Sequence, residues 1–148
     1  MLTTIEPLWS VDTNILVYAT ESDVPEFKRQ QAKLLLERLY SSEYGCLAGQ
    51  VVCEFMNVVI RKKLMTHGKA FEAVGLLSKG IRVLDVSRDA YAQAWELAAK
   101  HKYQVWDALI IAICADHGIK TLYSEDGGSL KRPLGVHVIN PFAELEHS

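Results

Sequence analysis

The chain has 148 residues, of which 49% are hydrophobic and 23% charged, and its formal net charge is −2. This size and composition are typical of one globular domain with a proper core, so we assign residues 1–148 to a single domain. The small net charge gives no overall basic signal for nucleic acid, although local basic residues can still contact phosphates.

The first half of the sequence alternates short apolar runs with segments of helical periodicity. A proline close behind polar residues 22–23 is typical of a helix start, and apolar residues then recur at helical spacing as far as Leu39. We predict strands at 8–11 and 44–48, and helices at 14–19, from about 22 to 39, at 50–62 and at 66–79, with Gly80 ending the last.

The second half continues the alternation. Ser87 is a suitable N-cap for a helix that runs to about His101, and Gly118 is a suitable C' residue for a later helix. We predict strands at 81–84, 121–124 and 136–139, and a helix at 106–117. Alternating strands and helices imply a parallel sheet with right-handed crossovers. The predicted fold is therefore a three-layer α/β/α domain with a central, mainly parallel sheet of four to five strands.

Three features of the sequence indicate where in the cell the protein is located. The three cysteines are odd in number, have no C-x-x-C spacing and lie in apolar surroundings, so we predict reduced core residues and a cytoplasmic protein. The N-terminus shows no basic region followed by an apolar run, and we expect no signal peptide. The longest apolar-rich stretch, 108–115, is too short to span a bilayer, so we expect no membrane association.

Four acidic residues fall where the predicted sheet presents its carboxyl edge. Asp12 follows the first strand and Asp126 lies just past the fourth, while Glu54 and Asp107 lie in the first turns of helices. Ligands of open α/β sheets bind at that edge. We therefore expect the carboxyl groups of Asp12, Asp107 and at least one of Glu54 and Asp126 to lie close enough to share a cation or its waters.

An all-carboxylate cluster suits Mg²⁺ or Mn²⁺, which prefer oxygen ligands and water. Such ions activate water and relieve charge in phosphodiester hydrolysis, and the protein then needs no nucleophile of its own. The chain has no G-x-S-x-G, H-E-x-x-H or P-loop motif, and its histidines lack metal spacing. Each acid taken alone is also compatible with a cap or turn role.

The four acids sit in short motifs that together resemble the PIN-domain nuclease family, and most closely the VapC-type toxins of toxin–antitoxin modules. The resemblance covers nearly the whole chain, and the four motifs occur in order at fitting spacing. They are residues 12–18 (DTNILVY), 54–57 (EFMN), 106–110 (WDALI) and 124–128 (SEDGG).

The resemblance implies a Mg²⁺- or Mn²⁺-dependent endoribonuclease. Asp12 and Asp107 would be the main metal ligands, and Glu54 and Asp126 would complete the cluster and orient metal-bound water. Cleavage would leave 5'-phosphate and 3'-hydroxyl ends on an RNA substrate. The resemblance also implies a cognate antitoxin whose C-terminal segment occupies the active-site groove, and a homodimer.

Several nearby residues have two interpretations. Asn14 would hydrogen-bond Asp12 or simply cap a helix, and Ser124 would bond a ligand water or a carboxylate or end its strand. Asp85 is a competing acid at the same edge, whereas Glu125 should point away from the cluster. Trp106 could stack on a base, but we expect it to be buried against the sheet.

Other functions compete with the toxin. A PIN-domain nuclease of housekeeping RNA processing and a non-catalytic binding module on the same scaffold both remain open. A receiver domain would need an acidic pair after the first strand and a lysine after the last. A haloacid-dehalogenase-type phosphatase would need an acid where Asn14 stands. We disfavour both.

Overall fold

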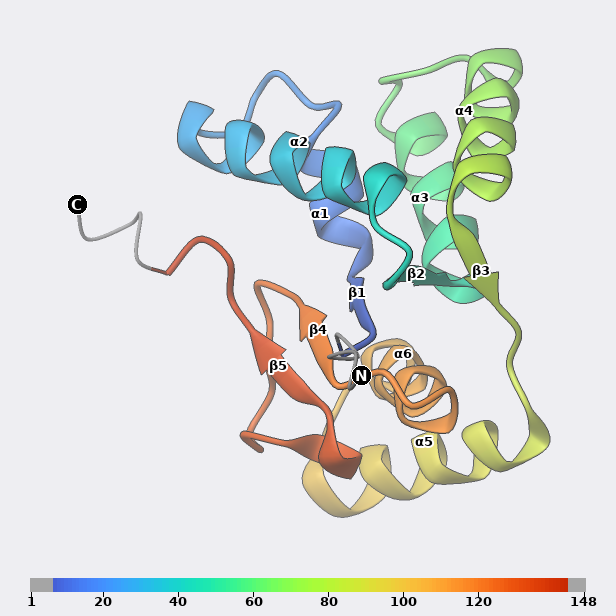
Figure 1. The fold of residues 1–148 in the computed structure, drawn as a ribbon, viewed down its shortest axis with the longest axis vertical. Coiled ribbons are helices and arrows are strands. Elements are labelled where there is room, and N and C mark those ends of the chain that lie inside the picture. Colours follow the sequence, from blue (N-terminus) through green and yellow to red (C-terminus); the bar gives the residue numbers. More distant parts are fainter. Residues whose placement is uncertain (1–6, 144–148) are drawn as a thin grey trace, which may run out of the picture.

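A five-stranded parallel sheet forms the centre of the computed structural model, which describes residues 7–143 (Figure 1). All neighbouring strands are parallel, and the order across the sheet is β3-β2-β1-β4-β5. The strands are β1 (Trp9–Val11), β2 (Gly45–Ala48), β3 (Arg82–Leu84), β4 (Thr121–Tyr123) and β5 (His137–Ile139).

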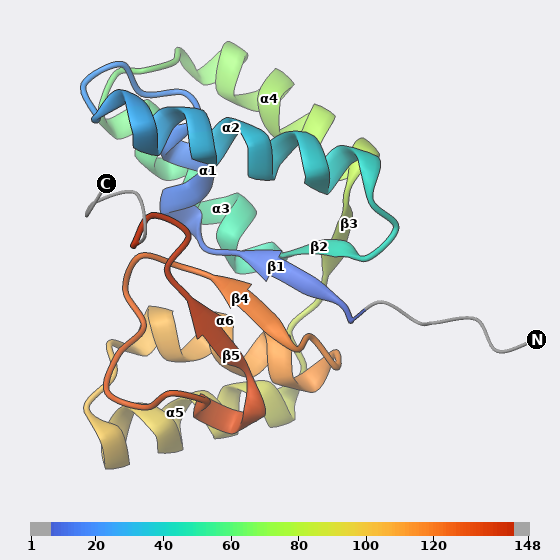
Figure 2. The same ribbon diagram turned by 60° about the vertical axis from the view of Figure 1, so that its left-hand side comes forward.

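Helices cover both faces of this sheet, which confirms the predicted three-layer arrangement. The view in Figure 2 places α1 to α4 on one side of the strands and α5 and α6 on the other. The helices are α1 (Thr13–Tyr18), α2 (Glu26–Ser41), α3 (Gly49–Arg61), α4 (His67–Gly80), α5 (Arg88–His101) and α6 (Val105–Asp116), and a 3₁₀ turn, η1 (Pro133–Gly135), precedes β5.

The strand order reverses direction between β1 and β4. The chain first builds outward from β1 to β2 and β3, and then returns through α5 and α6 to place β4 on the other side of β1. Such a switch point leaves a crevice outside the carboxyl ends of the two strands. Asp12 and Ser124 directly follow these strands.

The predicted strands and helices are all present, and they differ from the prediction mainly at their ends. Ser87 caps α5 as predicted, because its Oγ accepts from the Ala90 amide at 3.0 Å, and Gly118 follows α6 at φ +74°. The expected polar cap of α2 is wrong: Pro25 occupies the N-cap position, and no side chain caps the helix.

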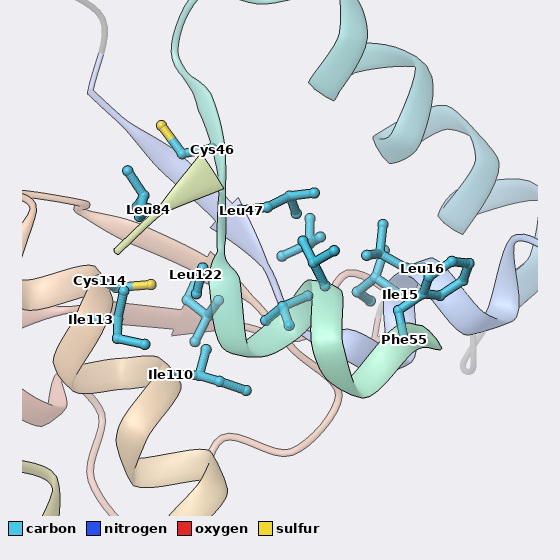
Figure 3. Close-up of a cluster of buried hydrophobic side chains, with 14 of the residues drawn as sticks. Ile15, Leu16, Cys46, Leu47, Phe55, Leu84, Ile110, Ile113, Cys114 and Leu122 are labelled. Carbon is cyan, nitrogen blue, oxygen red and sulfur yellow. The ribbon is translucent and has the colours of Figure 1, made fainter. Parts of the chain in front are cut away.

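The core extends through both layers of helices (Figure 3). Ile15, Leu16 and Phe55 pack on one face of the sheet, and Ile110 and Ile113 pack on the other. Helix α6 is buried at every position from 108 to 114, since it is enclosed between the sheet and α5. No helix within residues 7–143 is long and apolar enough to cross a membrane.

The prediction that all three cysteines belong to the core is right for two of them. Cys46 and Cys114 are free and buried, on β2 and α6 respectively. Cys53 is exposed, because it lies on the side of α3 that turns away from the sheet.

Two glycines with nearly the same φ angle allow the cost of a left-handed backbone to be compared with the cost of steric crowding. Gly118 has φ +74° and open space where a Cβ would point, whereas Gly128 has φ +70° and a Cβ there would approach Tyr103 to 2.3 Å. We expect Gly118→Ala to cost about 1–2 kcal/mol for the left-handed backbone. Gly128→Ala should cost at least about 1 kcal/mol more, for overpacking. Urea unfolding of both variants measures the difference, and equal losses would contradict the crowding.

Candidate acidic active site

Asp12 is held rigidly at the switch point between β1 and β4. It is the N-cap of α1, and its Oδ1 accepts from the Thr13 amide at 2.6 Å. Its Oδ2 accepts from the Ser124 hydroxyl, at the end of the neighbouring strand, at 2.8 Å. With only 8% of its surface exposed, the Asp12 carboxylate has one fixed orientation.

The predicted hydrogen bond from Asn14 to Asp12 is absent within the described residues, where Thr13 and Ser124 supply the bonds to Asp12 instead. Asn14 is exposed and lines the cleft beside Asp12. Asp12 is itself the N-cap of α1, and its two carboxylate oxygens are already bonded by the Thr13 amide and the Ser124 hydroxyl.

Glu54 is joined to the same corner by a residue that the sequence analysis did not single out. The Thr13 hydroxyl donates to Glu54 Oε2 at 2.6 Å, and the Gln50 side-chain amide donates to Glu54 Oε1 at 3.0 Å. The Gln50–Glu54 pair has the i,i+4 helical spacing, which is visible in the sequence. The Thr13 bond spans 41 positions, and no local pattern indicates it.

Asp107 lies in the first turn of α6, where its pKa responds both to burial and to the charges of the other acids. Burial raises the pKa of Asp107 to about 6, and the negative charges of Asp12, Asp126 and Glu54 act in the same direction. Burial also raises the pKa of Asp12, against the hydrogen bonds from Ser124 and Thr13. The four predicted acids therefore lie within electrostatic range of one another.

Asp126 is the most exposed of the four acids and lies on the loop after β4. The Ser124 hydroxyl accepts from the Asp126 amide at 3.2 Å, so one serine connects the Asp126 loop to Asp12. The Gly128 amide donates to Asp126 Oδ1 at 3.4 Å. Ser124 thus bonds a carboxylate, which is one of its two predicted roles.

Glu125 points away from the cluster, as predicted. It accepts from the Tyr18 hydroxyl at 2.7 Å and from Lys28 Nζ at 2.6 Å. Burial and the Glu125 carboxylate raise the pKa of Tyr18 to about 12, which keeps its hydroxyl protonated as a donor. These contacts fasten the Asp126 loop to α1 and α2 from behind the site.

A cleft of about 640 Å³ opens over three of the acids. Trp106 is 59% exposed on its rim, so the prediction that it packs against the sheet is wrong: α6 is buried from residue 108 onward, and Trp106 precedes that buried run. Asp85 does not line the cleft. The lining residues are Asp12, Thr13, Asn14, Gln50, Cys53, Glu54, Asn57, Val58, Arg61, Gln104, Trp106 and Asp107.

The donors of this cluster suit a hard divalent cation, because they are carboxylates. Burial and their like charges raise the pKa of Asp107, and a positive ion would relieve that repulsion. Within residues 7–143, no three His, Cys, Asp or Glu side chains are arranged to hold one ion directly. Direct sharing of a cation by three acids is thus not seen, and sharing through metal-bound waters stays a prediction.

The fold and the cleft define an α/β domain with an acidic site at the switch point of a parallel sheet. The family model of the PIN domain matches residues 10–133, and the chain belongs to the PIN-domain family. No curated protein sequence matches the chain.

Solved structures with similar folds include several toxin–antitoxin proteins. The VapC20 toxin of Mycobacterium tuberculosis is 26% identical with a TM-score of 0.62, over 80% of this chain and 90% of that one. FitAcB from Neisseria gonorrhoeae is 22% identical with a TM-score of 0.61, over 91% and 99%. VapBC2 from Rickettsia felis, bound to a promoter DNA fragment, is 18% identical with a TM-score of 0.65, over 90% and 98%. The VapC-like fold is therefore shared.

The raised pKa of Asp107 predicts how metal-free stability changes with pH. A carboxyl group whose pKa is higher in the folded state binds more protons there, so the free energy of unfolding falls as the pH rises from about 4 to about 6. Asp107→Asn should flatten this fall, since the amide carries no charge.

The matched control is Asp116→Asn, which makes the same change at the exposed far end of α6. Melting temperatures measured in a chelator across this pH range test the prediction. A profile for Asp107→Asn with the slope of the parent protein would contradict the raised pKa of Asp107.

Proposed function

We propose that this protein is a divalent-metal-dependent endoribonuclease that serves as the toxin of a toxin–antitoxin pair. The observation that carries the proposal is the cleft at the switch point, which Asp12, Glu54 and Asp107 line together. Burial and the charges of the neighbouring acids raise the pKa of Asp107 there. Mutually repelling acids beside an open cleft are costly in a protein that binds nothing there, and a cation offsets that cost.

In this proposal Asp12 and Asp107 hold Mg²⁺ or Mn²⁺, directly or through water, and Glu54 and Asp126 complete the cluster. When bound, the ion activates water and neutralises charge on the phosphate. Ser124 and the Thr13 amide fix the two oxygens of Asp12, while the Thr13 hydroxyl and Gln50 fix those of Glu54. Glu54 and Asp126 would orient the attacking water. Its oxygen would bond to phosphorus as the P–O3' bond breaks, and O3' would gain the proton that the water loses, leaving 5'-phosphate and 3'-hydroxyl ends.

The similar structures support an RNA substrate and a toxin role. VapC20 is described as a toxin that cleaves the sarcin–ricin loop, and it is 26% identical to this chain. VapBC complexes from Rickettsia felis and Salmonella typhimurium are bound to DNA, and one similar structure is a toxin–antitoxin complex from Klebsiella pneumoniae. We extend the antitoxin partner to this protein on that basis. The homodimer follows from the resemblance to the toxin family, and the cytoplasmic location follows from the unpaired cysteines.

An apolar groove between α2 and α4 is our candidate for part of the antitoxin contact. It holds about 130 Å³, and its walls are almost entirely apolar in composition. Leu76 of α4 lines it and is 66% exposed, and Phe71 of the same helix is 73% exposed. Large apolar side chains left in water favour a partner that covers them.

Catalysis should depend on the acids that hold the ion. We expect Asp12→Ala and Asp107→Ala each to lower RNA cleavage in Mg²⁺ or Mn²⁺ by at least about 100-fold, since even changes around metal ligands cost 10–100-fold. Asp116→Ala is the control, and cleavage should also stop in a chelator. The proposal is wrong if purified protein cuts no RNA with either ion, or if both variants keep full activity.

Partner binding should depend on the α2–α4 groove. Leu76→Glu should weaken the complex with the proposed antitoxin by at least about 10-fold, because it buries a charge in an apolar contact. RNA cleavage should persist, since Leu76 lies outside the acidic cleft. Leu34→Glu on α2, where Leu34 is 55% exposed and outside the groove, is the control. Equal loss in both variants, measured by calorimetry, would rule out the groove.

A further inference from the structure

Trp106 presents a large aromatic surface at the mouth of the acidic cleft. It is 59% exposed, and it lines the cleft together with its neighbour Asp107 and with Asp12. The following residues of α6, from 108 to 114, are all buried, so the helix is already anchored without the Trp106 side chain. Packing of the folded chain therefore does not explain a tryptophan at this position.

The surroundings of Trp106 suit a base and its phosphate. Side-chain amides of Gln104 and Asn57 line the same cleft and can donate to and accept from base edges. Arg61 also lines it and carries the positive charge that a phosphate prefers. An exposed aromatic ring beside polar groups and one cation is the usual composition of a stacking site for single-stranded nucleic acid.

We propose that Trp106 stacks on an unpaired base of the RNA substrate, next to the phosphodiester that reaches Asp107. The inference rests on the proposed function and deepens it by assigning a substrate-positioning residue. Stacking of one base fixes the neighbouring phosphate because the nucleotide backbone links the two over a short distance. It also predicts a single-stranded or looped target, since a base within a duplex has no free face.

The chain contains a matched control for this role. Trp95 on α5 is 62% exposed, nearly the same as Trp106, and its ring stacks on Tyr91 with centroids 6.1 Å apart. Trp95 does not line the acidic cleft. The two tryptophans therefore differ in location rather than exposure.

Binding of RNA can be measured without catalysis. In an Asp12→Asn background and in a chelator, short single-stranded oligouridylate and oligoadenylate should quench the intrinsic tryptophan fluorescence. Trp106→Leu should abolish most of that quenching and weaken binding, measured by anisotropy of labelled oligomers, by about 10-fold or more. Trp106→Phe should keep most of the affinity, because it retains a ring, and Trp95→Leu should leave both readings unchanged.

Any of three results would overturn the inference. Trp106→Leu could bind RNA as tightly as its parent, or Trp95→Leu could lose as much RNA affinity as Trp106→Leu. The parent could also bind no RNA. The stacking proposal and the nuclease proposal can fail independently of each other. RNA that is cleaved in Mg²⁺ while Trp106→Leu binds normally defeats the stacking role alone. Quenching that depends on Trp106 without any cleavage of RNA defeats the hydrolysis alone.

Discussion

Repulsion among carboxylates at one edge of the sheet is the constraint on which the rest of this structure depends. Burial and neighbouring negative charge both raise the pKa of Asp107, and burial raises that of Asp12. Hydroxyl and amide donors offset part of that cost: Ser124 and Thr13 donate to Asp12, and Thr13 also donates to Glu54. These donors come from the end of β4 and the start of α1. The strand order that creates the crevice therefore also places the hydrogen-bond donors that lower the cost of burying the acids there.

Much of the fold can be predicted because each strand and helix has a local signal. The caps at Ser87 and Gly118 follow from backbone chemistry within a few residues, and both are present. The predicted start of α2 is wrong because residues 22–23 have the composition of a cap, but the proline closest to the helix occupies the position. Strand ends shift by a residue because pairing with neighbours, which is not local, decides where a strand stops.

The site can be predicted only in part, because a sequence pattern indicates local interactions but not contacts between distant residues. Acids at the ends of strands and helices are visible in a sequence once the sheet is assumed. The bond from Thr13 to Glu54 joins α1 to α3, and nothing near Thr13 indicates it. Apolar sequence neighbours alone predict a core position for Cys53 and Trp106. Their exposure depends instead on which side of its helix each residue occupies and on where the buried part of α6 begins.

Helix α2 contacts both the loop that carries Asp126, through the Lys28–Glu125 ion pair, and the apolar groove against α4. Near its start, α2 carries Lys28, which pairs with Glu125 at 2.6 Å and lies over the rings of Tyr18 and Phe142. Two turns further on, Leu36 and Tyr40 of the same helix line the apolar groove against α4. A rigid helix cannot shift at one end without shifting at the other. A displacement of α2 at the groove therefore either breaks this ion pair or moves the loop that carries Asp126. The position of α2 links the apolar groove to the acidic site.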